Sequence, residues 1–178
     1  MVSGYLLSGK PGAGKTTLIR EVVARLTISA GGFYTEELRV GGVRQGFKII
    51  TLNGQEAVLS HINISSSCKV SKYGVDISNL EKVGVAAIQQ AIKDSDLVVI
   101  DEIGKMELLS SEFREAVLKA IDSGKKVLGT ILLPPHPFAD RIKKHPQVKV
   151  IEVNRANHDQ VLRQILSWLK PITDEDNT

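Results

Sequence analysis

Cysteine, aromatic residues and strong net charge are all scarce in this sequence, and each shortage excludes a class of protein. Among 178 residues there is one cysteine, Cys68, so an internal disulfide is excluded and a reducing compartment, the cytoplasm, is expected. Aromatic side chains make up 4% of the residues, so aliphatic side chains have to fill the core. The formal net charge of +3 is too small to indicate nucleic-acid binding by itself.

Long hydrophobic runs are also absent. No stretch approaches the roughly 18 uninterrupted apolar residues of a transmembrane helix, so we expect no contact with a membrane. The first residues lack a basic segment followed by a long apolar run, so we expect no signal peptide. The length indicates a single domain over residues 1–170, with a short acidic tail over residues 171–178, and we expect a monomer.

Apolar strand-like runs alternate with segments of helical spacing along most of the chain. This alternation predicts an α/β fold, with a mostly parallel sheet flanked by helices. The run 97–100 is continuously apolar, as expected for a strand buried on both faces. The other strands are expected at 5–7, 127–133 and 148–153, and helices at 15–26, 112–122, 138–145 and 157–169.

An antiparallel insert is expected after the first helix. Two β-rich runs, 33–40 and 45–52, flank Gly41-Gly42, which is typical of a hairpin turn. A third strand is expected at 56–62. A serine-rich connection then leads to another helix, where Ser78 and Glu81 have the spacing of a capping box.

The residues Gly9 to Thr16, Gly-Lys-Pro-Gly-Ala-Gly-Lys-Thr, match the P-loop pattern at every fixed position. Its glycines let the backbone curl and bring its N–H groups onto phosphate oxygens. The following helix adds its N-terminal dipole and free amides. Lys15 supplies a cation for the β- and γ-phosphates, and the Thr16 hydroxyl is a ligand for Mg²⁺. The motif therefore predicts a nucleoside-triphosphate site with Mg²⁺ as cofactor.

A P-loop requires an acidic partner at the end of a neighbouring strand. The run 97–100 ends in Asp101 and Glu102, which is typical of a Walker B strand. Asp101 is predicted to bind Mg²⁺ with Thr16. Glu102 is predicted to act as the general base that orients the attacking water, and pairing of Glu102 with a cation is the structural alternative.

Two further residues have two interpretations each. Lys105 either stabilises charge on the phosphates or pairs with Glu107 at the surface. Thr130 either senses the γ-phosphate or the water, or fills its strand as a β-branched residue. The predicted catalytic residues are Glu102, Lys15 and Lys105, and the predicted nucleotide-binding residues are Gly9, Lys10, Pro11, Gly12, Ala13, Gly14, Lys15, Thr16, Thr17, Asp101, Glu102, Ile103 and Gly104.

These motifs carry a family resemblance. The P-loop, the segment Gly32–Glu37, the pair Gly46-Phe47 and above all Asp101–Leu108 resemble the thermostable nucleoside-triphosphatase family. The resemblance covers most of the chain. It implies a RecA-like P-loop core with extra antiparallel strands, and slow Mg²⁺-dependent hydrolysis of ATP, GTP and other nucleoside triphosphates.

The resemblance also bears on two less certain parts of the site. It implies that Glu36 and Glu37 lie near the nucleotide, whereas the residues alone are equally typical of an exposed acidic pair on a hairpin. The family tends to carry Asn-Arg at the start of the last helix, where this chain has Asn157-His158, so the role of this helix start is open. Arg155 is either its substitute or a surface residue.

Two other functions fit a P-loop with Mg²⁺. A nucleotide, nucleoside or polynucleotide kinase transfers the same phosphoryl group to another acceptor, and its lid would have to be the basic segment 141–144. A nucleotide-gated RNA-binding switch would use the basic stretch 141–149, which has no aromatic residue for base stacking. The sequence has no Asn/Thr-Lys-x-Asp element for guanine, which favours loose base specificity.

Overall fold

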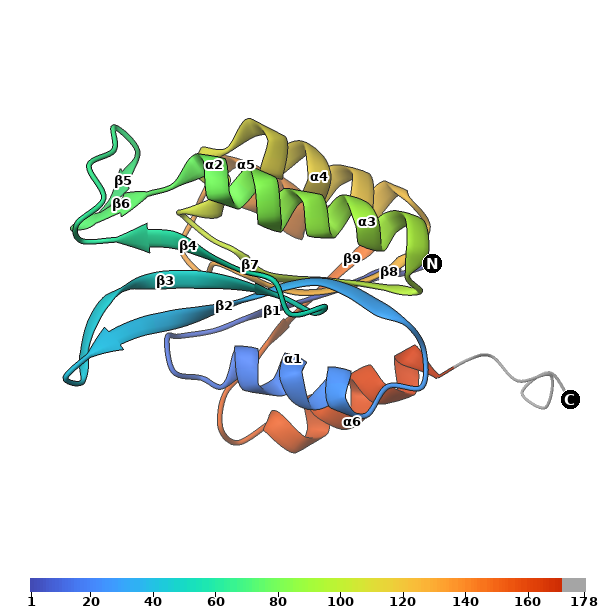
Figure 1. Ribbon diagram of the computed structural model, residues 1–178. Helices are drawn as coiled ribbons and strands as arrows, with labels where there is room; N and C mark the ends of the chain where they lie inside the picture. The colour runs from blue at the N-terminus through green and yellow to red at the C-terminus, as the bar shows by residue number, and fades with distance from the viewer. Residues whose placement is uncertain (171–178) are drawn as a thin grey trace, which may run out of the picture.

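The computed structural model describes residues 1–170 and consists of one nine-stranded sheet with helices on both faces (Figure 1). The acidic tail expected at residues 171–178 lies outside the described residues. The strands are β1 (Gly4–Ser8), β2 (Ala30–Val40), β3 (Val43–Thr51), β4 (Glu56–His61), β5 (Lys69–Val70), β6 (Tyr73–Val75), β7 (Leu97–Ile103), β8 (Lys126–Ile131) and β9 (Val148–Glu152).

Helices lie on both faces of this sheet. They are α1 (Lys15–Ala24), α2 (Ile77–Asn79), α3 (Ala86–Asp94), α4 (Ser111–Asp122), α5 (Pro137–Lys143) and α6 (His158–Leu169), with a π-helical turn at Leu80–Val85 and a 3₁₀ turn at Glu107–Leu109. In the described part of the chain, none of them combines the length and the apolar character that crossing a membrane requires.

The parallel half of the sheet has the order β2-β7-β8-β1-β9. Side chains of β7 alternate between its two faces, because successive Cβ atoms of a strand point in opposite directions. Val98 and Ile100 join the core under α3 and α4, whereas Leu97 and Val99 join the core under α1 and α6 (Figure 1). Both faces are buried, which is why the run 97–100 is continuously apolar.

The expectation of a mostly parallel sheet is wrong, because the sheet is mixed. The predicted hairpin is present, with Gly41 and Gly42 at positive φ of 56° and 78° between β2 and β3. However, β2 pairs with β7 along its first residues and with β3 along the rest, so the insert continues the main sheet. The strands β3, β4, β6 and β5 extend it with antiparallel pairs.

The capping box expected at Ser78 and Glu81 is also wrong. The helical segment begins at Ile77, and the side chain of Asp76 accepts a hydrogen bond from the backbone N–H of Asn79. Glu81 instead accepts a 2.7 Å hydrogen bond from the hydroxyl of Ser110, which is the N-cap of α4. Asp76 thus caps the helical segment, whereas Glu81 joins it to the start of α4.

Candidate active site

The P-loop connects β1 to α1 through a turn in which two positions, Gly9 and Gly14, require glycine. Gly14 is the N-cap of α1 and has a φ of 89°, in the left-handed region. At Gly9 a Cβ atom would lie 2.6 Å from the carbonyl oxygen of Val153, so a side chain there would clash with the backbone after β9. The free amides at the start of α1 consequently face the loop, as in an anion-binding site.

The ammonium of Lys15 lies over this loop. Its Nζ donates hydrogen bonds of 2.7 Å to the carbonyl oxygen of Gly9 and 3.1 Å to that of Lys10. A phosphate oxygen bound at the loop would be able to replace these carbonyl partners. The side chain is therefore held where it can meet a triphosphate.

Asp101 lies at the end of β7 and is 2% exposed. Its Oδ1 accepts a 2.6 Å hydrogen bond from the hydroxyl of Thr130 on β8. Burial raises the pKa of Asp101, and the hydrogen bond from Thr130 together with the nearby hydroxyl of Thr16 opposes this shift. Its Oδ2 is buried and has no hydrogen-bond partner among the described residues. Thr130 thus binds the acid, and does not merely fill its strand.

These oxygens fit a divalent cation. A buried carboxylate oxygen without a partner is costly, and a hard cation such as Mg²⁺ is the partner it lacks. The hydroxyl of Thr16 from α1 belongs to the same group of atoms. Within residues 1–170, no three His, Cys, Asp or Glu side chains are grouped as metal ligands. Such a small protein set suits Mg²⁺, which takes its remaining ligands from phosphates and water.

Glu102 follows Asp101 through a cis peptide bond and is partly buried. Burial raises its pKa, the negative charge of Asp101 raises it further, and Lys15 lowers it. The side chain lies over Gly104, where a Cβ atom would stand 2.5 Å from Glu102 Oε1. The glycine of this loop therefore makes room for the carboxylate. A base with a raised pKa accepts a proton more readily than an ordinary glutamate.

Glu107 is a third buried acid that the sequence does not mark as functional. It belongs to the 3₁₀ turn after β7 and is 3% exposed. Burial and the negative charge of Glu102 raise its pKa well above the ordinary value, while backbone N–H groups at Glu107 and Gly104 lower it. No ion pair joins it to Lys105 within residues 1–170, and Lys105 is exposed at the same site.

One cavity of about 670 Å³ joins most of these residues. It brings together the P-loop, the end of β7, the hairpin and the chain after β8. The predicted site residues that line it are Gly9, Pro11, Gly12, Lys15, Thr16, Asp101, Glu102 and Lys105. The predicted residues that do not line it are Lys10, Ala13, Gly14, Thr17, Ile103 and Gly104. Of these, Thr17 is exposed and Ile103 is buried in the core.

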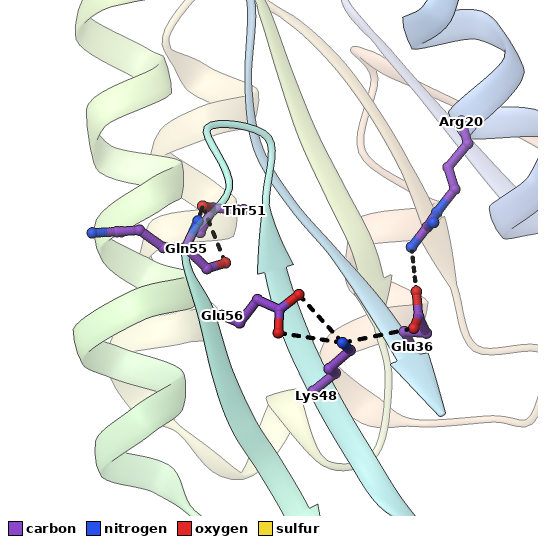
Figure 2. A network of polar contacts seen from close by, with 6 residues as sticks. All are labelled: Arg20, Glu36, Lys48, Thr51, Gln55 and Glu56. Atoms are coloured by element: carbon purple, nitrogen blue, oxygen red, sulfur yellow. Dashed lines mark hydrogen bonds and ion pairs between the residues drawn. The ribbon is translucent and has the colours of Figure 1, made fainter. Parts of the chain in front are cut away.

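The acidic pair of the hairpin also lines the cavity, and both acids are paired with cations. Glu36 lies between Arg20 of α1, at 3.2 Å, and Lys48 of β3, at 3.8 Å (Figure 2). Glu37 pairs with Arg39 and Arg44. No sequence motif marks Arg20, although its spacing of four residues from Thr16 places both on one side of α1.

The start of α6 lies on another side of the P-loop. His158 Nε2 is 3.2 Å from a carboxylate oxygen of Glu21, and its Nδ1 would be 3.6 Å from a Cβ atom on Gly14. Arg155 is exposed in the turn before α6. Neither residue lines the cavity. In the basic segment, Lys143 pairs with Asp140 and Arg141 packs on Phe138.

Comparison with known proteins identifies relatives along most of the chain. The family model described as NTPase matches residues 4–166. The nucleoside-triphosphatase THEP1 of Thermotoga sp. (strain RQ2) is 49% identical over 165 residues, which are 93% of this chain and 94% of the relative. The cancer-related nucleoside-triphosphatase of Homo sapiens is 37% identical, over 96% of this chain and 98% of the relative.

A solved structure matches as well. The crystal structure of THEP1 from the hyperthermophile Aquifex aeolicus superimposes with a TM-score of 0.87 and 36% identity, covering 94% of this chain and 99% of that chain. The solution structure of the human protein gives a TM-score of 0.81 over 98% of this chain. The mixed sheet and its helices are thus shared with both.

Proposed function

The chain belongs to the NTPase family, and from this premise we propose that it is a Mg²⁺-dependent nucleoside triphosphatase that releases phosphate from ATP, GTP and other nucleoside triphosphates. Relatives named nucleoside-triphosphatases cover nearly the full chain. The parallel half of the sheet, with the P-loop after β1 and the acids after β7, is the part we assign to a RecA-like core.

One observation carries the proposal: the P-loop cation and two acids from the end of β7 line the same cavity. Lys15 and the amides at the start of α1 would hold the triphosphate, with its γ-phosphate toward Glu102. Glu102, whose pKa is raised, would take a proton from the attacking water. Hydrolysis then breaks the bond between the γ-phosphorus and the bridging oxygen, which leaves with the diphosphate.

Mg²⁺ would be held by Asp101 and Thr16, since Oδ2 of Asp101 lacks a hydrogen-bond partner among the described residues. When bound, Mg²⁺ neutralises charge on the phosphate oxygens. Thr130 would keep the Asp101 carboxylate oriented through its hydrogen bond. Lys105, exposed on the cavity rim, would stabilise the charge that develops on the phosphates.

A phosphate-release assay with ATP, GTP, CTP and UTP, with Mg²⁺ and with EDTA, tests the proposal. We expect turnover of all four with Mg²⁺ and none with EDTA. Lys15→Ala should abolish turnover, whereas Lys93→Ala, which changes an exposed lysine of α3 outside the cavity lining, should keep it. Turnover of only one of the four triphosphates would contradict the proposed range of substrates. Equal turnover with EDTA would contradict the requirement for Mg²⁺.

A further inference from the structure

The cavity extends beyond the residues that would hold the phosphates. From Glu102 it continues to a second wall on β3 and β6, formed by Arg44, Phe47 and Tyr73. The cavity measures about 670 Å³. The roles proposed for Lys15, Asp101 and Glu102 concern the triphosphate group, its cation and the attacking water, and they leave this second wall without an assigned role.

The second wall is an aromatic platform. The rings of Phe47 and Tyr73 meet edge to face, with centroids 5.7 Å apart. The guanidinium of Arg44 lies 5.1 Å from the centroid of Phe47, and its Nε donates a 2.9 Å hydrogen bond to the Tyr73 hydroxyl. Tyr73 is buried, while Phe47 is partly exposed beside the cavity. Such a fixed, partly exposed ring is a surface on which a planar ligand packs.

The charges of this wall are already paired. Arg44 Nη1 lies 3.0 Å from Glu37 Oε1, and Arg39 contacts the other oxygen of Glu37 at 2.6 Å. The hydrogen bond from Arg44 is the main cause of the lowered pKa of Glu37, so this carboxylate stays ionised at neutral pH. Arg39 and Arg44 therefore both have the carboxylate of Glu37 beside them.

The neighbouring acid is paired in the same way. Figure 2 shows Arg20 reaching Glu36 from α1, with Lys48 between Glu36 and Glu56. An anionic ligand would have to displace one of these carboxylates to pair with Arg20, Arg44 or Lys48. An uncharged ligand can instead donate hydrogen bonds to them, because paired carboxylates keep free lone pairs. The wall thus favours a neutral ring compound with hydroxyl or amino donors.

We propose that this second wall binds an uncharged nucleoside, with its base against Phe47 and its hydroxyl groups directed to the carboxylates of Glu36 and Glu37. The inference rests on the proposed function, in which the P-loop, and not the second wall, holds the triphosphate. A bound nucleoside displaces water from the space beside Glu102. Phosphate release from ATP therefore falls when the second wall is occupied.

Calorimetric titration of the full chain, saturated with a non-hydrolysable ATP analogue and Mg²⁺, tests the inference. Adenosine, guanosine, cytidine and uridine are the probes, and ribose and the 5′-monophosphates are the comparisons. We expect at least one nucleoside to bind, ribose not to bind, and the monophosphate to bind more weakly than its nucleoside. The same nucleoside should lower phosphate release from ATP. Formation of a nucleoside monophosphate would also support the site: a ligand hydroxyl bonds to the γ-phosphorus, the diphosphate leaves, and the hydroxyl proton passes to Glu102.

Phe47→Leu keeps an apolar side chain but removes the stacking surface. It should weaken nucleoside binding about tenfold, the equivalent of about 1.4 kcal/mol and within the usual value of a base–aromatic contact. Phe138→Leu is the matched control, since this ring lies on α5 outside the cavity lining. Circular dichroism and Tm establish that both variants are folded.

Three results would overturn the inference: no nucleoside binds, the ATP analogue displaces the nucleoside, or Phe47→Leu binds it as tightly as Phe138→Leu does. Tight binding of single-stranded oligonucleotides without nucleoside binding would also overturn it. Affinity for the ATP analogue is measured separately in each variant. If the wild-type chain does not bind the ATP analogue, the proposed function is contradicted. If it binds the analogue but no nucleoside, only the inference about the second wall is contradicted.

Discussion

The hydroxyl of Thr130 donates a 2.6 Å hydrogen bond to Oδ1 of Asp101, while Oδ2 of the same carboxylate is buried and unpaired among the described residues. The register of two strands produces this contact. Ile100 of β7 pairs with Gly129 of β8, so the residue that follows each of them lies at the same edge of the sheet. One oxygen of the acid is thus fixed, and the other is left for a cation.

Thr130→Val should raise the Mg²⁺ concentration required for half-maximal turnover by about 10- to 100-fold, the usual effect of losing a hydrogen bond to a metal ligand. The hydrogen bond from Thr130 lowers the pKa of Asp101, so its loss raises that pKa further. Asp101 has to be ionised to bind Mg²⁺. The acid limb of the activity profile should therefore move to higher pH, which a Mg²⁺ titration and a pH profile measure.

Thr130→Ser is the matched control, because it keeps the hydroxyl and loses only a methyl group. It should restore most of the Mg²⁺ affinity and the wild-type acid limb. Equal behaviour of the two variants would mean that Thr130 acts by packing alone, as a β-branched residue of its strand.

Asp101→Asn should separate stability from activity. Burial raises the pKa of Asp101, so the ionised form is costly in the protein without metal. Removing that charge should raise the Tm of the metal-free protein, by about 2–4 °C for each kcal/mol gained in the free energy of unfolding. The Mg²⁺ requirement for turnover should rise sharply, because an amide is a poorer ligand for a hard cation. A lower Tm together with an unchanged Mg²⁺ titration would contradict both effects.

Glu107→Gln tests the third buried acid through the pH dependence of stability. Burial raises the pKa of Glu107 in the folded chain, so the folded state holds a proton that the unfolded state releases first. Its contribution to stability is therefore present below the ordinary glutamate pKa and is lost as the pH rises. We measure the free energy of unfolding by urea titration without nucleotide between pH 4 and 8. The value for the variant, relative to that of the wild-type chain, should increase as the pH rises.

Glu115→Gln supplies the comparison for this measurement, since Glu115 is exposed on α4. Its difference from the wild-type chain should be small and should not grow with pH. A constant difference for Glu107→Gln would mean that the pKa of Glu107 is the same in the folded and unfolded states, against the direction that its burial imposes.

Local patterns predicted the parts of the site that neighbours in sequence define. The P-loop and the Asp101-Glu102 pair each occupy one short segment, and the Gly41-Gly42 turn is set by its own backbone. The mixed sheet was missed for a different reason. The strand β2 is 11 residues long, and its two halves pair with different partners, which no local signal reveals.

The second wall of the cavity could not be predicted for the same reason, because it depends on contacts between distant parts of the sequence. Arg44 and Tyr73 are 29 positions apart, and their hydrogen bond depends on strands β3, β4 and β6 being in register. A register shift between Leu38 and Arg39 further changes which side chains face Glu37. Arg20 was predictable from the sequence, because helical spacing places it on the same side of α1 as Thr16.

Glu102→Gln is the strongest test of the hydrolase proposal. Glutamine keeps the size and the hydrogen-bonding capacity of the side chain and removes the base. Affinity for a non-hydrolysable ATP analogue and for Mg²⁺ should stay within a few-fold, since Lys15, Thr16 and Asp101 carry the binding. Single-turnover cleavage of ATP should fall by roughly 10²- to 10⁴-fold, which corresponds to about 3–5 kcal/mol of transition-state stabilisation.

The comparison variant is Glu56→Gln, which changes an exposed acid of the Figure 2 network that does not line the cavity. It should cleave ATP at close to the wild-type rate. Normal cleavage by Glu102→Gln would remove Glu102 as the base and direct attention to Glu107, the other buried glutamate of the cavity whose pKa is raised. Loss of analogue binding together with cleavage would instead show that the side chain supports the loop after β7, where it packs on Gly104. Retained binding with lost cleavage is the result that a general base requires.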